Sequence, residues 1–395
     1  MHSIRKYLQQ KNTEQLLYYI SFALIFIGEF INTTMFLELR APLGCLSYVG
    51  CVIMLAKILI YQRKNQVHLL LLLITIGLFL LSGFLSNNYT TMFSLVMITV
   101  GAYNVPFKNI AKEYFWIAFT LMVTTIFCSL TGVIENLQYT FETARGIRNS
   151  FGIVYPTDFA AHILFITMAF IIAYEEKLNI VHSLAGILIT AVIYYFCDTR
   201  VDCACMLLAW AGIPLIKILQ KKKLPDILKK ICGGICILSM PVASVLMIVL
   251  SAVYTGSSPF MSALNELING RLAFANEGFE RYSVTLFGQQ VRLIGAGGST
   301  VISPDYFFLD CSYIYCLLKY GIIVTLLLVI AYVFIGIRYK HNGIILWIIA
   351  ITALNCMIAH HLPNVSYVFF TAAVFADIEA NKSAVKSPGK ISSDT

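Results

Sequence analysis

The sequence predicts an all-α polytopic membrane protein with about twelve transmembrane helices and one large polar loop. Of its 395 residues, 59% are hydrophobic and only 12% are charged, whereas soluble globular domains contain about 25% charged residues. Apolar runs of roughly 20 residues, long enough to cross a bilayer as helices, recur along the whole chain. A single long polar interval, residues 255–308, interrupts them in the C-terminal half.

The apolar runs predict one integral membrane domain, residues 1–380, followed by a disordered cytoplasmic tail, residues 381–395. The first run follows a polar, basic N-terminus and is too long for the core of a signal peptide, so we interpret it as a retained anchor. The twelve predicted spans are 16–37, 41–61, 67–86, 90–106, 114–134, 156–174, 180–197, 201–219, 231–254, 309–335, 343–360 and 363–379.

Lysine and arginine residues predict the orientation of these spans. With the N-terminus in the cytoplasm, 20 of the 28 Lys and Arg residues fall on the cytoplasmic side and seven on the outer side, while Lys319 lies within a span. Because cytoplasmic loops carry an excess of positive residues, both termini are predicted to be cytoplasmic. The large loop 255–308 is then extracytoplasmic, and the chain is expected in the cell membrane as a multi-pass protein.

All seven cations on the predicted outer side are arginines. They are Arg40, Arg145, Arg148, Arg200, Arg271, Arg281 and Arg292. Arginine is preferred over lysine where a planar fork must hold phosphate or carboxylate through two hydrogen bonds. This pattern indicates an outer site that handles anions. Arg148 and Arg271 are the strongest candidates to bind one, and Arg145 and Arg281 are weaker candidates.

Within the large loop, apolar residues recur at helical spacing and predict an amphipathic helix. They are Ile268, Leu272, Ala275, Phe279 and Tyr282. Asn269 is the predicted N-cap. Arg271 then falls in the first turn, where unpaired backbone N–H groups and the helix dipole favour an anion. The alternative is a solvated helix that lies on the bilayer surface, and the loop alone does not separate the two.

The predicted outer turn 359–364 contains two adjacent histidines, His360 and His361. Neutral histidine is well suited to take a proton from a hydroxyl near neutral pH. Either residue is therefore a candidate general base, with His360 slightly preferred, and the alternative is a polar anchor at a helix end. Asp158 and His162 share one face of the predicted sixth span, so we expect them to line a cavity.

Two further ionisable residues lie within predicted spans. Glu29 is a lone carboxylate in the first span, and the sequence shows no partner for it. Lys319 either contacts a partner inside the protein or extends to the membrane surface.

Motifs for other chemistries are missing. The 11 cysteines include no CxxC pair, and the sequence Gly295-Ala-Gly297-Gly298 is neither a P-loop nor a dinucleotide fingerprint. No DxD pair lies in a cytoplasmic loop, and no HExxH or GxSxG motif is present. We therefore expect no metal and no cofactor. The net charge of +8 is explained by the membrane sides and does not indicate nucleic acid.

Three segments carry a family resemblance. The first is Arg148-Asn-Ser150-Phe-Gly152 with Tyr155-Pro156, the second is Asn269-Gly-Arg271-Leu272 with Thr285-Leu-Phe287-Gly288, and the third is Asp310-Cys-Ser312-Tyr313 with Leu317-Leu-Lys-Tyr320-Gly321. With an outer histidine near the C-terminus, they resemble Wzy-type polysaccharide polymerases of the O-antigen ligase/polymerase superfamily, especially those of Gram-positive capsule or exopolysaccharide clusters. The resemblance covers about residues 145–365. The family often has Asn where this chain has Asp158, and Cys311 interrupts its Asp–Ser pair.

The resemblance implies a metal-independent glycosyltransferase with a GT-C-like, all-helical membrane architecture. Such an enzyme polymerises lipid-diphosphate-linked oligosaccharide repeat units on the outer face of the cytoplasmic membrane, from an undecaprenyl-diphosphate-linked donor. Arginines would offset the charge that develops on the leaving diphosphate, and a histidine would activate the acceptor hydroxyl. Asp310, Asp158 and His162 complete the expected substrate-binding set. Candidate partners are the lipid bilayer, a chain-length regulator and a flippase.

Three other functions compete with this one. An O-antigen-ligase-like transferase would use the same chemistry to attach glycan to a different acceptor. A lipid-linked-oligosaccharide flippase would be expected to show internal repeats and charges near mid-bilayer in several helices. A sensor or scaffold explains the hydropathy but not the arginine-only outer set.

Overall fold

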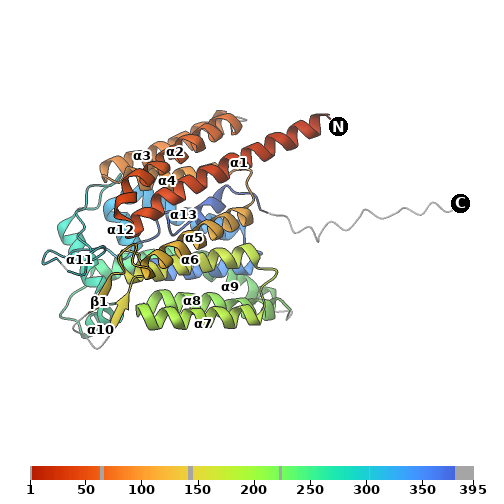
Figure 1. Cartoon of the computed structure of the whole chain (residues 1–395). Helices are drawn as coiled ribbons and strands as arrows, with labels where there is room; N and C mark the ends of the chain where they lie inside the picture. Colours follow the sequence, from red (N-terminus) through yellow and green to blue (C-terminus); the bar gives the residue numbers. More distant parts are fainter. Residues whose placement is uncertain (1, 63–65, 141–145, 222–224, 302, 379–395) are drawn as a thin grey trace.

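The computed structural model describes residues 2–62, 66–140, 146–221, 225–301 and 303–378. Long helices lie side by side in a bundle, and short elements gather at one end of it (Figure 1). The α-helices are α1 (His2–Phe30), α2 (Leu37–Tyr61), α3 (Gln66–Leu85), α4 (Tyr89–Gly101), α5 (Phe107–Leu130), α6 (Pro156–Tyr174), α7 (Ile180–Cys197), α8 (Arg200–Lys221), α9 (Asp226–Ala252), α10 (Pro259–Leu267), α11 (Arg271–Arg281), α12 (Ser312–Lys319), α13 (Gly321–Arg338) and α14 (Gly343–Cys356). The other elements are the 3-10 helices η1 (Ile31–Thr33) and η2 (Phe370–Val374) and the antiparallel strands β1 (Gln138–Thr140) and β2 (Ile147–Asn149).

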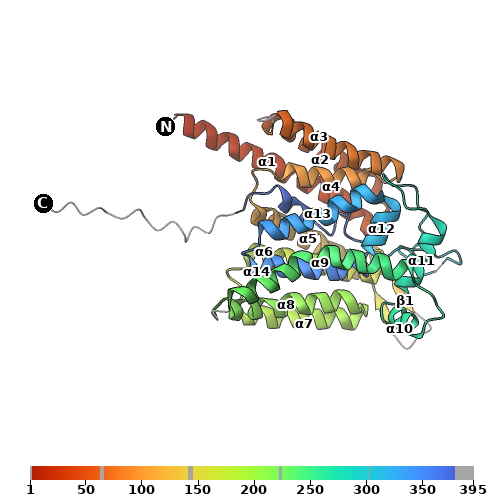
Figure 2. The same cartoon turned by 180° about the vertical axis from the view of Figure 1, so that it is seen from behind.

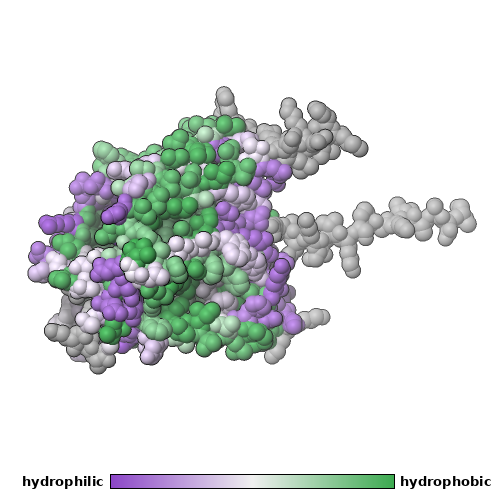
Figure 3. All heavy atoms as spheres, in the orientation of Figure 1, coloured by the Kyte–Doolittle hydropathy of each residue, from purple (hydrophilic) through white to green (hydrophobic). Residues whose placement is uncertain are grey.

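Among the described residues, eight helices are long and apolar enough to cross a membrane: α1, α2, α5, α6, α7, α8, α9 and α13. Three shorter apolar helices lie at Leu69–Leu85, Tyr89–Gly101 and Gly343–Cys356. Hydrophobic residues form a broad band around the middle of the molecule, and hydrophilic residues collect at its two ends (Figure 3). The chain is therefore an all-α, multi-pass membrane protein whose partner is the lipid bilayer, as the sequence predicts.

The predicted last span, 363–379, is not an α-helix, so a count of twelve helices does not describe this part of the chain. Most of its described residues, 363–378, are buried inside the protein in turns and the short helix η2; Val368 and Phe369 are fully buried. Non-helical backbone is tolerated at membrane depth where protein groups satisfy it. Here Tyr114 donates to the carbonyl of Tyr367 at 2.7 Å, and Arg338 donates to the carbonyls of Val374 and Ala376.

We call the end of the bundle that contains β1, β2, α10 and α11 the loop end (Figures 1 and 2). Helix α1 begins at the opposite end. The last described residues return there, because Asp377 exchanges backbone hydrogen bonds with Val105 and Phe107 and lies 3.8 Å from Lys11. Both described ends of the chain therefore lie at one end of the bundle. Which end faces the cytoplasm stays a prediction from the Lys and Arg residues.

The predicted amphipathic helix is α11. Arg271 is its first residue, and Leu272 and Ala275 are buried as expected. Asn269 does not cap it. Asn269 and Gly270 both have positive φ angles, and the capping oxygen comes from Asn265, whose Oδ1 accepts from the N–H groups of Leu272 and Ala273 at 3.1 Å. The sequence prediction missed α10, which supplies this cap.

Two glycines of the resembling segments hold the loop against the bundle. The predicted tenth span breaks between α12 and α13 at Gly321, which has φ +84°, and Gly288 of the loop has φ +98°. A Cβ on Gly321 would lie 2.4 Å from the backbone nitrogen of Gly288. Only glycine allows this approach, in which Gln289 N–H donates to the carbonyl of Lys319 at 3.0 Å.

Candidate active site

A cavity of about 730 Å³ lies at the loop end. Its walls come from β2 and the start of α6, from the α7–α8 turn, from α11, and from segments 295–297, 306–310 and 358–361. These stretches are far apart in the sequence, and they include parts of the predicted large loop 255–308 and of the predicted outer turn 359–364. It is lined by Arg148, Arg200, Arg271, Asp158, Asp202, Asp310, His360 and His361, among other residues.

Arg271 is held in place by two acceptors. One terminal nitrogen, Nη2, lies 3.1 Å from Asp310 Oδ2, and Nη1 donates to the carbonyl of Asn269 at 2.9 Å. Its Nε is buried and has no hydrogen-bond partner within the described ranges. A buried donor without an acceptor costs about 1–3 kcal/mol.

Arg148 enters the cavity from strand β2, where it pairs with Tyr139 of β1. Its side chain is largely buried, and its Nε donates to the carbonyl of Cys197 at the end of α7 at 2.8 Å. The guanidinium also lies over the ring of Tyr155, 5.8 Å from its centroid. A backbone carbonyl and an aromatic ring thus fix this cation at the cavity wall. Arg200, the first residue of α8, adds a third guanidinium to the lining.

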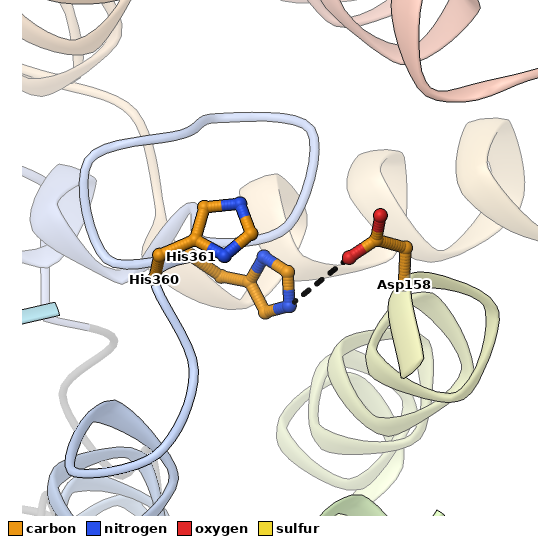
Figure 4. Close-up of side chains that lie close together, drawn as sticks. All are labelled: Asp158, His360 and His361. Carbon is orange, nitrogen blue, oxygen red and sulfur yellow. Dashed lines mark ion pairs between the residues drawn. The ribbon is translucent and has the colours of Figure 1, made fainter. Parts of the chain in front are cut away.

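His361 faces the carboxylate of Asp158 on α6 (Figure 4), and His360 faces the carboxylate of Asp310, which precedes α12. His361 Nε2 lies 3.8 Å from Asp158 Oδ1 on α6, and His360 Nδ1 lies 3.8 Å from Asp310 Oδ1 before α12. The side chain of His360 is 25% exposed, whereas that of His361 is 4% exposed. Nδ1 of His361 is buried with no partner in the described part of the chain. His360 is therefore the histidine that a bound molecule can reach.

His361 is part of a stack of three rings. Tyr367 packs face to face against His361 at 4.0 Å and, on its other side, against His162 at 4.1 Å. His162 is fully buried and contacts the hydroxyl of Thr33 through Nε2 at 2.9 Å. It does not line the cavity, so it supports the site from behind instead of contacting a substrate directly.

Burial and neighbouring cations keep the histidines neutral. Burial, and then Lys319 and Arg271, lower the pKa of His360 to about 4. Burial, followed by His360 and His162, lowers the pKa of His361 well below its usual value. The pKa of the Asp310 carboxyl is raised by burial, and Arg271 opposes that rise. Both imidazoles are therefore neutral at neutral pH.

In the described part of the chain, Asp158, His360 and His361 are also close enough to meet at one metal ion, since one ligand atom of each lies within 4.8 Å of the others. This ligand set of one carboxylate and two imidazoles suits zinc or a similar divalent cation. His361 Nε2 and Asp158 Oδ1 lie 3.8 Å apart. The arginines could supply positive charge at the same cavity without a metal. A site that uses a metal ion would lose activity in a chelator, whereas a site that uses arginines alone would not.

The structure brings together six of the nine residues predicted for the site: Arg148, Arg271, Asp158, Asp310, His360 and His361. Arg281 lies at the other end of α11, paired with Glu277 and packed 4.4 Å over the ring of Phe307. It does not line the cavity. Arg145 lies outside the described residues. Of the two alternatives predicted for Lys319, the structure shows the contact inside the protein, where its Nζ lies 3.2 Å from the hydroxyl of Tyr315.

Sequence reasoning missed several lining residues. Arg200 and Asp202 belong to an outer turn that the arginine pattern had already marked. Asp202 accepts a hydrogen bond from Asn355 of α14 at 2.9 Å. Tyr306 also lines the cavity and gave no sequence signal that separates it from an ordinary core tyrosine. Comparisons with family models, curated proteins and solved structures find no match to this chain.

Proposed function

We propose that this protein is a glycosyltransferase that polymerises lipid-diphosphate-linked oligosaccharide repeat units into a capsular or exopolysaccharide at the outer face of the cytoplasmic membrane. The observation that carries the proposal is the meeting, in one cavity at a membrane face, of arginines from three separate elements with a pair of neutral histidines. The sequence resemblance to Wzy-type polymerases supports the same reaction. An undecaprenyl-diphosphate-linked oligosaccharide is the proposed donor.

Arg148 and Arg271 bind the donor diphosphate in this proposal. Both guanidinium groups are already oriented by protein carbonyls or a carboxylate, so little side-chain freedom is lost on binding. As the bond to the sugar breaks, negative charge grows on the leaving diphosphate. Fixed cations at that position stabilise the transition state more than the ground state, and no metal is required.

His360 acts as the general base. The acceptor hydroxyl oxygen attacks the anomeric carbon of the donor and forms the new glycosidic bond. The bond between that carbon and the diphosphate oxygen breaks, and its electron pair leaves with the diphosphate. The hydroxyl proton passes to His360, whose Nδ1 faces Asp310 and whose Nε2 is therefore the atom that receives it. Asp310 thus contacts both the base and Arg271, and orients them relative to each other.

His361 and Asp158 support this arrangement. His361 is too buried to receive the proton itself, and its ring is clamped between His360 and Tyr367. A fixed His361 ring holds His360 in position against the cavity. A cavity at the membrane face suits substrates that are anchored in the bilayer. The lipid-linked donor already carries its diphosphate leaving group, so the reaction needs no nucleotide.

The test is deletion of the gene in a strain that makes polysaccharide, followed by complementation. If the proposal holds, the deletion strain accumulates single repeat units on the lipid carrier, and wild-type protein restores long chains. Complementation with His360→Gln should leave single units, at membrane abundance equal to wild type.

Two outcomes contradict the polymerase. Long chains that lack their final attachment indicate a ligase, which would use the same cavity on another acceptor. Repeat units that remain on the cytoplasmic leaflet, protected from an external probe, indicate a flippase.

A further inference from the structure

A second, smaller cavity of about 470 Å³ lies at the loop end on the other side of η1. It is built from the end of α1, the start of α2, the start of α4 and Asn364. The region formed by α1–α4 lies outside the stretch that carries the family resemblance. Of its twelve lining residues, nine are polar, so most of the wall carries hydrogen-bonding groups.

The polar lining is held in place by its own contacts. Asn88 donates to the Tyr320 hydroxyl at 2.7 Å and accepts from Thr91 at 3.0 Å. Tyr48 and Thr90 share a hydrogen bond of 2.8 Å between their hydroxyls. These contacts orient the groups before any ligand arrives, as recognition sites require.

Glu29 is the buried anion of this cavity. Its side chain is 6% exposed, and Oε1 accepts from Ser94 at 2.8 Å, while Oε2 receives no hydrogen bond from any residue that the structure describes. The cavity also contains a cation, Arg40. Its Nε and Nη2 donate hydrogen bonds to the carbonyl of Thr34, which leaves Nη1 for a ligand. The cavity therefore offers a strong acceptor and a strong donor together.

This mixture of groups selects the ligand class. A diphosphate is disfavoured, because the buried carboxylate of Glu29 would repel it. An acyl chain is disfavoured, because it would leave the polar lining desolvated and unpaired. A sugar hydroxyl both donates and accepts, so it can bond to the Glu29 carboxylate, the Arg40 guanidinium and the amides of Asn32 and Asn364.

The two cavities share a thin wall. Thr33 lines the second cavity, and its carbonyl accepts from the N–H of Val154, which lines the first, at 2.9 Å. The carbonyl of His361 in the first cavity accepts from the N–H of Asn364 in the second at 3.0 Å. A glycan whose reacting end lies beside His360 would therefore lie close to the second cavity.

We propose that the second cavity is a carbohydrate-binding site that holds electrically neutral, hydroxylated sugar residues of the glycan, away from the reacting bond. Glu29 and Arg40 are its main ligand-binding residues. The identity of this glycan rests on the proposed function. The binding itself requires no turnover, so the two proposals can fail separately.

The experiment measures binding of repeat-unit oligosaccharide, released from the strain's own polysaccharide and free of lipid and phosphate, to the purified full chain in nanodiscs. Inorganic pyrophosphate is the second probe. Glu29→Gln keeps the shape of the side chain, and we expect it to weaken oligosaccharide binding about ten- to hundredfold, since one charge-assisted hydrogen bond is lost. Arg40→Gln should have an effect of the same order, and Tyr48→Phe is a milder variant in case either fails to accumulate.

The matched control is Glu38→Gln, which changes an exposed carboxylate of α2 outside both cavities and should leave binding unchanged. Arg271→Ala should abolish pyrophosphate binding and preserve oligosaccharide binding. The proposal is overturned if the oligosaccharide does not bind, if the Glu29, Arg40 and Tyr48 variants bind it as wild type does, or if pyrophosphate displaces it. If the deletion test contradicts the polymerase proposal but Glu29→Gln still weakens oligosaccharide binding, the carbohydrate-binding site is supported independently of the proposed function.

Discussion

Arg271 allows the sharpest test of the first cavity. Its guanidinium is fixed between Asp310 and Asn269, and its side chain is only 19% exposed, so solvent screens it weakly. A hydrogen bond between charged groups contributes about 1.5–3 kcal/mol. Arg271→Ala removes both hydrogen bonds of the fork and should reduce transition-state stabilisation by about 3–6 kcal/mol. This corresponds to a fall in kcat/KM of roughly a hundred- to ten-thousandfold. Arg271→Lys keeps the charge but only one bond, and should cost about ten- to a hundredfold.

The assay is the rate of chain extension from purified lipid-linked repeat units, followed as a ladder on gels, at equal membrane abundance. Arg292→Lys is the control, since Arg292 is an exposed arginine of the same loop that does not line the cavity. The reasoning is refuted if Arg271→Lys extends chains at the wild-type rate. It is also refuted if Arg292→Lys is as impaired as Arg271→Lys, because the loss would then not depend on the place of Arg271 in the cavity.

The other predictions concern the base, the metal, the fold and the orientation. His360→Gln should lower the rate about a hundred- to ten-thousandfold. Since the pKa of His360 is lowered to about 4, the base stays neutral as the pH falls, and the acid limb of kcat/KM should lie near pH 4–5; a limb near 6.5 would contradict this. EDTA should leave activity unchanged, whereas a loss restored by zinc would assign a metal to the histidine pair. Gly321→Ala should lower membrane abundance, because its Cβ would collide with the Gly288 backbone; normal abundance would show that this approach is dispensable. Reporters fused after Ser283 and Lys221 should report opposite membrane sides, and the same side for both would refute the orientation.

The sequence by itself determined the membrane class, because the number and length of apolar runs leave a soluble fold no way to bury them. It also marked much of the cavity. Arginine is the cation preferred for holding phosphate or carboxylate, so Arg148 and Arg271 could be selected by residue type and position in the sequence. A transfer to a hydroxyl needs a base near the cations, and this requirement selected the histidines of the outer turn. The structure brings His360 and His361 into one cavity with those arginines.

Tertiary structure decided what hydropathy cannot separate. An apolar run has the same signal whether lipid or protein covers it, so the irregular, protein-buried segment after His361 was predicted as a helix. The cap on α11 comes from Asn265 in the preceding helix α10, seven residues before the N–H group of Leu272 that it caps. The contact between Thr33 and His162 joins residues 129 positions apart, and no local pattern encodes it. Local propensity and hydropathy report on a residue's own segment, whereas the second cavity and the ring stack exist only where distant segments pack together.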